Sequence, residues 1–490
     1  MKKLLTSLLV IAILLTCCVS VLAACDKRDY DYTITFYTQQ NDDLQKVTQN
    51  AIDSFEAKYP GWHIDHQIIS NGYDGVRDKT IADLSGKKQP DLAYCYADHV
   101  SLYMKTGKVI DVMQYINETG VATYVDSETG ETVTTDQVVG YTAEEIANFV
   151  PAYYNEGNAV NFSDYEKYGF AATSKLMMPF AKSTELMYYN KTALKELGVT
   201  TVPQTWDELF ALKDKVNQKW PTATLLGYDS EANWFITESE RQGWGYTSTN
   251  NEQHYLFNNT RAAAWLDKLG AMRTDITSQG KYKTYTSNLF KLGPEEGGVV
   301  FCVGSSGGAK NQNTTKFEVG IARVPGSLVF DNDNKPVIDE TTGKQKIDYR
   351  CISQGPSLVM LKSDKAKNPE QKALMTWMFV KELYDPGVLA SVASLQGYCS
   401  PMSNTADLVP SYKKDLDEAI GSDGKIVNIT HAATKFAEEL SKDGLLFTSP
   451  AFVGSSEART QVGNALQYVI EGTASGKDAL QEAYNNCGGK

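Results

Sequence analysis

The stretch Tyr32-Thr33-Ile34-Thr35-Phe36-Tyr37 alternates polar and apolar side chains as a β-strand does, and the segments that follow it decide the fold class. Residues 42–59 carry apolar side chains at helical spacing and end at a Pro-Gly pair. A second strand is expected at 62–69, followed by a helical stretch to Leu84 and a short strand at 91–94. Strands that alternate with helices predict an α/β fold with mainly parallel pairing.

Length and composition describe a large, acidic, globular protein. The chain has 490 residues, which at about 100–200 residues per domain indicates two or three domains. Hydrophobic residues make up 42% and charged residues 22% of the chain, as is typical of a well-packed protein. The 60 acidic residues outnumber the 47 basic ones, and the formal charge is −13. This balance argues against a nucleic acid partner and against binding to anionic membrane surfaces.

The N-terminus has the pattern of a secretion signal. Lys2 and Lys3 precede an apolar run at 8–15 that is too short to span a bilayer, so residues 1–24 are interpreted as a signal peptide. The sequence Leu22-Ala23-Ala24-Cys25 resembles a bacterial lipobox, which implies a diacylglycerol on Cys25 and a tether at 25–32. Ordinary signal cleavage beside an incidental cysteine is the alternative. We therefore expect a lipid-anchored protein on the outer or periplasmic side of the cell membrane, with a mature charge of −15 once the two lysines are removed.

The cysteines do not form a recognisable framework. Two of the 8 lie in the signal and Cys25 is the expected anchor, which leaves five without CxxC spacing: Cys95, Cys302, Cys351, Cys399 and Cys487. Neither a zinc site nor a dense set of disulfides is expected, although one disulfide is compatible with the count. We predict no metal site.

Several sequence blocks occur in the order seen in one receptor family. They include Met178-Pro179-Phe180-Ala181-Lys182-Ser183-Thr184-Glu185, Pro203-Gln204-Thr205-Trp206-Asp207, Val319-Gly320-Ile321-Ala322 and Gln396-Gly397-Tyr398. In these blocks the chain resembles the family 1 extracellular solute-binding proteins, the maltose-binding-protein-like receptors that feed ABC importers. The resemblance implies a type II fold of two lobes joined by hinge crossovers, with a ligand cleft between them. It also implies a monomer that binds a small solute, contacts permease subunits, uses no cofactor and catalyses no reaction.

The resemblance also implies how the chain is divided between the lobes. The first lobe would comprise residues 33–182 and 305–386, and the second residues 183–304 and 387–490. A solute that contacts both lobes would stabilise the closed form, which a transporter can distinguish from the open one.

The expected ligand contacts in the first lobe follow its strands. Tyr37 and Gln39 lie at the end of the first strand, where open α/β sheets bind ligands. Asp98 matches a family carboxylate that accepts sugar hydroxyls, and its alternative role is that of a helix cap.

The other expected contacts lie at a crossover and in the second lobe. Ser183, Thr184 and Glu185 stand at the crossover between the lobes. Trp234 and Tyr398 are expected to stack on a pyranose ring, with packing in the core as the alternative.

One segment departs from the maltose-binding pattern. Where those receptors carry a Trp, Gly304 is followed by Ser305-Ser306-Gly307-Gly308, so Ser305 and Ser306 become candidate contacts. This turn resembles that of glycerol-3-phosphate receptors, which keeps a polyol phosphate open as the alternative solute. The segment also fits Gly-x-Ser-x-Gly, the nucleophile elbow of serine hydrolases, with His431 as the available base. A neutral oligosaccharide remains the preferred solute.

Overall fold

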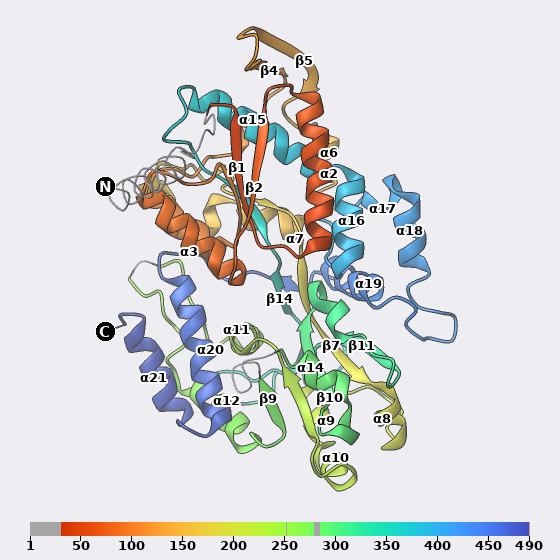
Figure 1. Cartoon of the computed structure of the whole chain (residues 1–490). Helices are drawn as coiled ribbons and strands as arrows, with labels where there is room; N and C mark the ends of the chain where they lie inside the picture. Colours follow the sequence, from red (N-terminus) through yellow and green to blue (C-terminus); the bar gives the residue numbers. More distant parts are fainter. Residues whose placement is uncertain (1–30, 251, 279–284, 490) are drawn as a thin grey trace, which may run out of the picture.

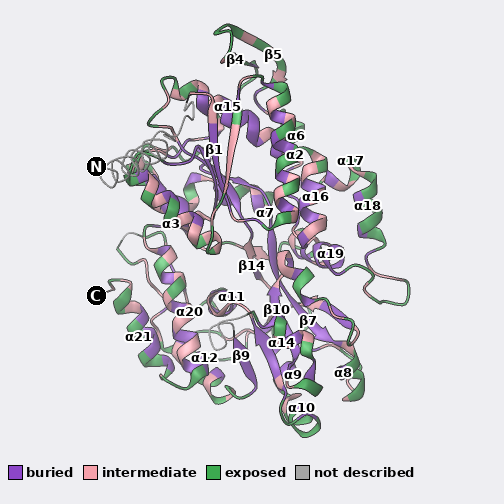
Figure 2. Cartoon of the chain, in the orientation of Figure 1, coloured by how far each residue is buried: buried purple, intermediate pink, exposed green. Residues whose placement is uncertain are grey.

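The computed structural model describes residues 31–250, 252–278 and 285–489. It consists of two lobes, one above the other in Figure 1, and each lobe is built around a β-sheet covered by helices. Figure 2 shows that most strands of both sheets are buried, apart from the edge strand β2 (His63–Ile68), while the outer faces of the helices are exposed. The predicted α/β class is therefore confirmed, and the expected signal, Cys25 and most of the tether lie outside the described residues.

The first lobe contains a sheet with the strand order β2-β1-β3-β15-β6. Its strands are β1 (Thr33–Thr38), β2 (His63–Ile68), β3 (Leu92–Cys95), β6 (Met178–Pro179) and β15 (Ser357–Met360). Strands β1, β2 and β3 are parallel, whereas β15 is antiparallel to both β3 and β6. Side chains alternate across the sheet, so Leu92 and Tyr94 enter one hydrophobic core while Ala93 and Cys95 enter another.

Helices cover both faces of this sheet. They are α2 (Asp42–Lys58), α3 (Gly72–Ser85), α4 (Ala97–Met104), α5 (Met113–Ile116), α6 (Ala143–Ala147), α7 (Pro151–Tyr154), α15 (Pro369–Leu383) and α16 (Pro386–Gln396). Helix α2 begins where Asn41 caps the backbone N–H of Leu44, and it buries the predicted apolar face at Leu44, Ile52 and Phe55. Helices α15 and α16 pack against α2 from later in the chain.

The second lobe contains a seven-stranded sheet with the order β16-β14-β7-β10-β8-β9, and β11 pairs with β7 off this path. Its strands are β7 (Ser183–Asn190), β8 (Thr224–Tyr228), β9 (Ile276–Ser278), β10 (Val299–Ser305), β11 (Val319–Arg323), β14 (Cys351–Gln354) and β16 (Leu446–Phe447). Strand β7 is buried along its whole length. Its residues Leu186 and Tyr188 enter one core and Met187 enters the other, so this sheet also has a hydrophobic layer on each face.

The helices of the second lobe come from two separate parts of the chain. They are α8 (Lys191–Glu196), α9 (Trp206–Phe210), α10 (Lys213–Lys219), α11 (Glu231–Gln242), α12 (Thr260–Ala271), α14 (Ser287–Leu292), α17 (Thr405–Leu408), α18 (Pro410–Asp417), α19 (Ile429–Lys442), α20 (Ser455–Glu471) and α21 (Gly476–Asn486). The 3₁₀ turn η5 (Ser306–Gln312) follows β10 and packs against α19. Helices α20 and α21 pack on α11 and α12.

The chain crosses between the sheets at closely placed segments. Residues 180–182 join β6 to β7, and Gly355-Pro356 joins β14 to β15. The buried Lys182 donates from Nζ to Glu156 at 2.6 Å and to the carbonyl of Gly355 at 3.0 Å. Gly355 has φ +88°, and a Cβ there would lie 2.0 Å from the carbonyl oxygen of Ala181. Glycine is therefore required for the two crossovers to approach each other.

Two expectations about the topology are corrected. The pairing is mixed rather than mainly parallel, because β7 and β15, the strands that follow the crossovers, run antiparallel to every strand with which they pair. The first lobe was expected to resume at residue 305, but β11 and β14 both pair with β7, so the first sheet is rejoined only at β15. Helix α16 packs both on α2 of the first lobe and on α19 of the second, so it lies between the lobes.

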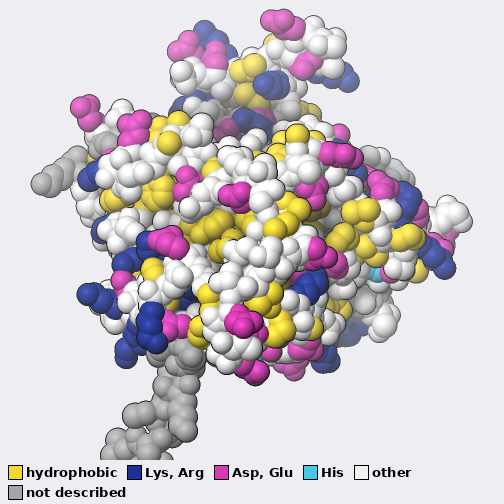
Figure 3. Space-filling view, turned by 90° about the horizontal axis from the view of Figure 1, so that it is seen from above, with side chains coloured by type: hydrophobic (Ala, Val, Ile, Leu, Met, Phe, Trp, Pro, Cys, Tyr) yellow, Lys and Arg dark blue, Asp and Glu magenta, His cyan; other side chains and the backbone are white. Residues whose placement is uncertain are grey.

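Smaller features complete the surface. The hairpin β4 (Val121–Val125) and β5 (Thr132–Val138) projects from the upper end of the first lobe, and β12 (Ser327–Leu328) pairs with β13 (Ile347–Asp348). Seen from above in Figure 3, acidic and basic side chains are interspersed over the described surface. Among the described helices, none has the length and apolar character needed to cross a bilayer. The five cysteines named above are all free thiols, and all but Cys487 are buried.

Candidate functional site

The two lobes enclose a cavity of about 420 Å³ at the ends of their strands. From the first lobe and the crossovers it is lined by Gln39, Gln40, Asn41, Leu44, Tyr73, Tyr94, Tyr96, Ala181, Ser183, Gln354, Pro356, Val392, Gln396 and Tyr398. From the second lobe it is lined by Glu185, Asp229, Ser230, Asn233, Tyr285, Ser287, Ser305, Gly307, Gly308, Asn311 and Gln312. Strands β1, β3, β8, β10 and β14 all end here, as expected for a ligand site in open α/β sheets. We call this cavity the neutral compartment, because its lining contains no Lys or Arg and burial raises the pKa of both its acidic side chains, Glu185 and Asp229.

A second cavity of about 740 Å³ shares part of this lining, including Gln39, Tyr73, Tyr96 and Asn233. It extends between α3 and α4 of the first lobe and α11 and α20 of the second. We call it the charged compartment, because Arg77, Lys182 and Arg459 line it together with several carboxylates: Asp74, Asp98, Glu156, Asp229 and Glu231. The shared residues join the two compartments into one interlobe cleft.

The predicted contacts of the first lobe divide between the cleft and the core. Gln39 lines both compartments, and Asp98 lines the charged one. Asp98 also accepts a hydrogen bond from the backbone N–H of His99, so part of its capacity is used at the start of α4. Tyr37 does not line the cleft. Its ring packs in the hydrophobic core beneath α3, and its hydroxyl donates to Asp83 of that helix at 2.8 Å.

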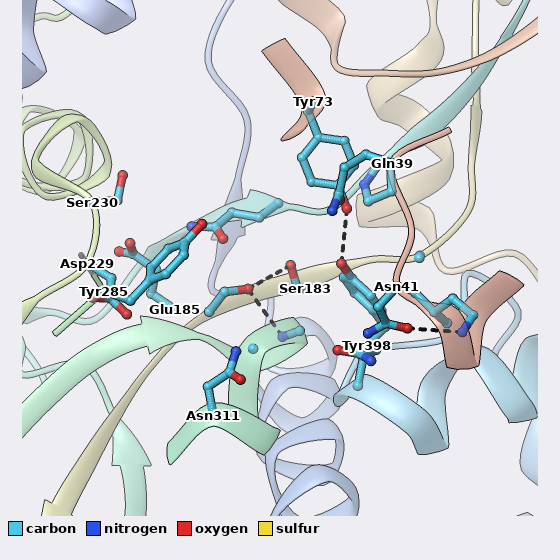
Figure 4. A pocket seen from close by; sticks show the side chains of 18 of the residues that line it. Gln39, Asn41, Tyr73, Ser183, Glu185, Asp229, Ser230, Tyr285, Asn311 and Tyr398 are labelled. Carbon is cyan, nitrogen blue, oxygen red and sulfur yellow. Dashed lines mark hydrogen bonds between the residues drawn. The ribbon is translucent and has the colours of Figure 1, made fainter. Parts of the chain in front are cut away.

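The residues at the crossover also divide. Ser183 and Glu185 line the neutral compartment, whereas the intervening Thr184 is fully buried and donates to the carbonyl of Ile352. Ser305 faces the cleft and donates to Ser183 Oγ at 3.2 Å, as Figure 4 shows. Ser306 is fully buried and accepts from the backbone N–H of Thr184. The alternation of side chains along β7 explains why its neighbouring residues face opposite ways.

Tyr398 supplies an aromatic surface at the Gly-Ser turn. A Cβ on Gly307 would lie 2.4 Å from its ring, so the tyrosine occupies the space that the glycine leaves open. The hydroxyls of Tyr398 and Tyr73 are 3.0 Å apart and share a hydrogen bond, which joins the crossover to helix α3 of the first lobe (Figure 4). Burial raises the pKa of both phenols, so both hydroxyls are protonated at neutral pH and able to donate.

Trp234 packs in the core instead of facing the cleft. Only 1% of it is exposed, and its ring stacks on Tyr228 with centroids 4.6 Å apart. Helix α11 turns Asn233 toward the cleft and therefore turns Trp234 away from it. The predicted stacking on a pyranose is therefore wrong for Trp234, and the alternative, packing in the core, is correct.

Two carboxyl groups of the second lobe have perturbed acidity at the cleft. Burial raises the pKa of Glu185 to about 7, although hydrogen bonds from Tyr228 and Asn233 partly oppose the shift. Burial likewise raises the pKa of Asp229 to about 6, against hydrogen bonds from the backbone and hydroxyl of Thr286 at 2.6 and 2.8 Å. Both groups can therefore carry a proton near neutral pH and exchange hydrogen bonds with a polar ligand.

The cations of the charged compartment already have partners. Arg77 donates to Asp74 and Asp78 at 2.8 Å each and also to Ser456 of α20, which links the two lobes. Arg459 donates to the side-chain oxygen of Asn233. Lys182 is held by Glu156 at the hinge, so none of the three cations stands alone.

Several lining residues escaped sequence reasoning. Asp229 directly follows β8, so recognising that strand would have pointed to it. Tyr73 carries no local signal, because only the fold brings α3 to Tyr398. Among the residues that the structure describes, no cluster of three His, Cys, Asp or Glu side chains is placed to hold a metal ion.

Comparison with known proteins agrees with this architecture. UgpB of Mycobacterium tuberculosis, in complex with glycerophosphocholine, has a TM-score of 0.66 and 15% identity over 93% of this chain and 97% of that one. Lmo0181 of Listeria monocytogenes, an ABC substrate-binding protein in complex with cycloalternan, has a TM-score of 0.65 and 14% identity over 94% and 99%. Maltose-bound MalE3 of T. maritima has a TM-score of 0.64 and 14% identity over 93% and 99%. These likenesses show the expected two-lobed type II fold.

A search of curated proteins found no match. The profile of the bacterial extracellular solute-binding proteins, in contrast, matches residues 50–418, which is well over half of the chain. By this match and by its fold, the chain belongs to the family of bacterial extracellular solute-binding proteins.

Proposed function

We propose that the protein captures a neutral carbohydrate of oligosaccharide size in the interlobe cleft and delivers it to an ABC importer. The observation that carries this proposal is the neutral compartment, whose lining combines amides, hydroxyls and tyrosines from both lobes. Amide side chains both donate and accept hydrogen bonds, as sugar hydroxyls require. Tyr73, Tyr96 and Tyr398 add ring faces suited to the apolar face of a pyranose.

The carboxyl groups support the same class of solute. Glu185 and Asp229 present oxygen atoms that accept from hydroxyl groups, and their raised pKa values leave them less charged than exposed carboxylates. A neutral ligand therefore meets little uncompensated charge in this part of the cleft. The two joined cavities of about 420 and 740 Å³ favour an extended ligand over a single sugar.

A polyol phosphate such as glycerol 3-phosphate is the second candidate. Arg77 and Arg459 line the charged compartment, and guanidinium groups bind phosphate in a bidentate manner. The glycerophosphocholine complex of UgpB adds support through the shared fold. The existing hydrogen bonds of both arginines count against this candidate, because a phosphate would have to replace them.

A serine hydrolase using Ser306 is not supported. The side chain is fully buried and hydrogen-bonded to a backbone amide, so a substrate could not reach it without rearrangement of η5. The function we propose is binding and release without bond cleavage.

Delivery follows from the arrangement of the lobes about the crossovers. A solute that bonds to Gln39 on one side and Asn311 on the other stabilises the closed form, which the permease subunits would recognise. We further propose that Cys25 is lipidated after removal of residues 1–24 and holds the monomeric receptor at the outer face of the cell membrane. Mass spectrometry of the mature N-terminus tests this anchor, and an unmodified N-terminus other than Cys25 would exclude it.

The solute class is tested by thermal melting of the protein without its first 25 residues. Oligosaccharides, monosaccharides and glycerol 3-phosphate are added singly. A solute at about 100 times its Kd should stabilise the folded state by about 2.7 kcal/mol. Stabilisation by an oligosaccharide, with none by glycerol 3-phosphate, supports the proposal. Stabilisation by glycerol 3-phosphate alone would favour the second candidate. That stabilisation should then be lost in Arg459→Gln and kept in the control Arg273→Gln, at a residue on the exposed surface.

A further inference from the structure

The second lobe contains a separate cavity of about 350 Å³ that the interlobe cleft does not include. It lies among α9, α11, α12 and the chain before and after β12. Its walls are mainly aromatic: Trp206, Phe210, Trp234, Trp244, Trp265 and Phe330. Four of the chain's 7 tryptophans are thus gathered around one cavity.

Helix α11 separates this cavity from the cleft. Asn233 and Ile236 face the charged compartment, whereas Trp234, Glu238 and Gln242 face the aromatic cavity. These last three residues are four positions apart, so they form one stripe along the helix. The cavity therefore has its own wall and opening, and a ligand bound there would not contact a solute in the cleft.

Two of the aromatic rings carry hydrogen-bond donors without partners. The indole Nε1 atoms of Trp234 and Trp244 are buried, and neither has a hydrogen-bond partner among the described residues. In contrast, Trp206 Nε1 donates to Glu238 at 3.0 Å. Both N–H groups have almost no accessible surface, so they lie within the packed wall and are out of reach of a molecule in the cavity.

Charge at the cavity is balanced within the protein. Lys268 and Asp207 form an ion pair of 2.9 Å at the exposed rim. Arg261 donates to the backbone carbonyls of Gln242 and Phe330. Glu238 is paired with Arg241, so the charged side chains at the cavity already have partners, and the cavity offers mainly aromatic and aliphatic surfaces.

We propose that this cavity is a second binding site, which takes a neutral compound with an aromatic ring. The volume falls in the range of small-molecule sites, and such sites are lined mainly by apolar and aromatic side chains with a few polar groups. Trp244 and Trp265 are only partly buried and supply most of the aromatic surface, whereas Trp234 is 1% exposed and supports them from the core. This site is independent of the solute proposed for the cleft.

The test uses acetophenone, a neutral aromatic ketone, and the tryptophan indole N–H signals of the ¹⁵N-labelled protein. A probe this small should bind with a Kd on the order of 1 mM. We expect shifts of the signals of Trp206, Trp234, Trp244 and Trp265. The signals of Trp62 and Trp377, which donate to backbone carbonyls in the first lobe, should stay in place.

Two matched variants on α12 locate the binding. Ala264 lines the cavity on an exposed part of the helix, so Ala264→Met should block the probe. Ala271→Met on the same helix lies outside the lining and should bind acetophenone as the wild type does. An unchanged signal of Trp220, which lies in the same lobe outside this cavity, shows in both variants that the lobe is intact.

A third variant tests the aromatic wall. Trp244→Ala removes a ring that lines the cavity, and it should raise the Kd about fivefold, as loss of about 1 kcal/mol of ring stacking predicts. The proposal is overturned if acetophenone shifts none of the four signals, or if Ala264→Met binds it as well as Ala271→Met does. It is also overturned if maltotriose, and not acetophenone, produces the shifts.

Discussion

The ion pair of Lys182 and Glu156 at the crossovers should be a major determinant of stability. The two side chains are 2% and 7% exposed, and Nζ lies 2.6 Å from the carboxylate. Nζ also donates to the carbonyl of Gly355, and Glu156 accepts from Ser353, so the pair ties both crossovers together. Lys182→Met removes one partner and leaves a buried carboxylate without its counterion. Breaking a buried pair in this way should lower the free energy of unfolding by about 3–5 kcal/mol.

Urea unfolding at pH 7 measures this cost, and a double-mutant cycle isolates the pair. Glu156→Gln in the Lys182→Met background removes the uncompensated charge. The free energy of unfolding of the double variant should therefore exceed the value expected from adding the two single losses by about 2 kcal/mol. Lys46→Met, at an exposed residue of α2, serves as the control and should change stability by less than about 0.5 kcal/mol. A loss below about 1 kcal/mol in Lys182→Met, or strict additivity in the cycle, would refute this reasoning.

Two further predictions concern a cleft carboxyl and a hinge glycine. Burial raises the pKa of Glu185 to about 7 from its ordinary 4.5, so the folded state holds this proton more tightly than the unfolded state does. The stabilisation that the proton gives is complete below pH 4.5 and is lost as the pH rises to 7. The free energy of unfolding of Glu185→Gln, measured in urea, should therefore rise relative to that of the wild type by on the order of 2 kcal/mol between pH 5 and pH 8. The exposed control Glu471→Gln should show no such trend. Equal pH profiles for Glu185→Gln and the wild type would contradict the pKa shift. In Gly355→Ala the new Cβ clashes with a carbonyl oxygen, and the positive φ is unfavourable for alanine. Together these effects should lower the free energy of unfolding by at least about 2 kcal/mol. Gly444→Ala, with φ +68° and open space, should cost only about 1 kcal/mol by the same assay, and equal losses would mean that the close approach is unimportant.

Local patterns predicted individual elements well. Helix α2 and its buried face followed from the spacing of Leu44, Ile52 and Phe55, because a helix depends on neighbours within one turn. The lobe boundary at residue 305 failed because β11 is recruited by pairing with β7, more than a hundred residues earlier, and no local signal reports such a pairing. The succession of strands and helices was therefore visible in the sequence, but the sheet to which each strand belongs was not.

The candidate site was predicted where it depends on strand ends. Gln39 follows β1, Ser183 begins β7 and Ser305 ends β10, and all three line the cleft. Trp234 was placed by its residue type alone, and the partner that buries it, Tyr228, comes from a neighbouring strand. Tyr73 was missed because it reaches the cleft from the first turn of α3, a helix that only the tertiary fold brings there.

The most direct test of the central proposal is calorimetric titration of an oligosaccharide into a variant with a filled cleft. Gly308 lines the neutral compartment, and the nearest atom to a Cβ there is 4.0 Å away, so Gly308→Phe should fill the compartment without disturbing the backbone. Gly86→Phe, at an exposed helix end of the first lobe, is the matched control. We predict binding of one oligosaccharide per wild-type chain, retained in Gly86→Phe and lost in Gly308→Phe. Undiminished binding in Gly308→Phe would contradict a carbohydrate site between the lobes.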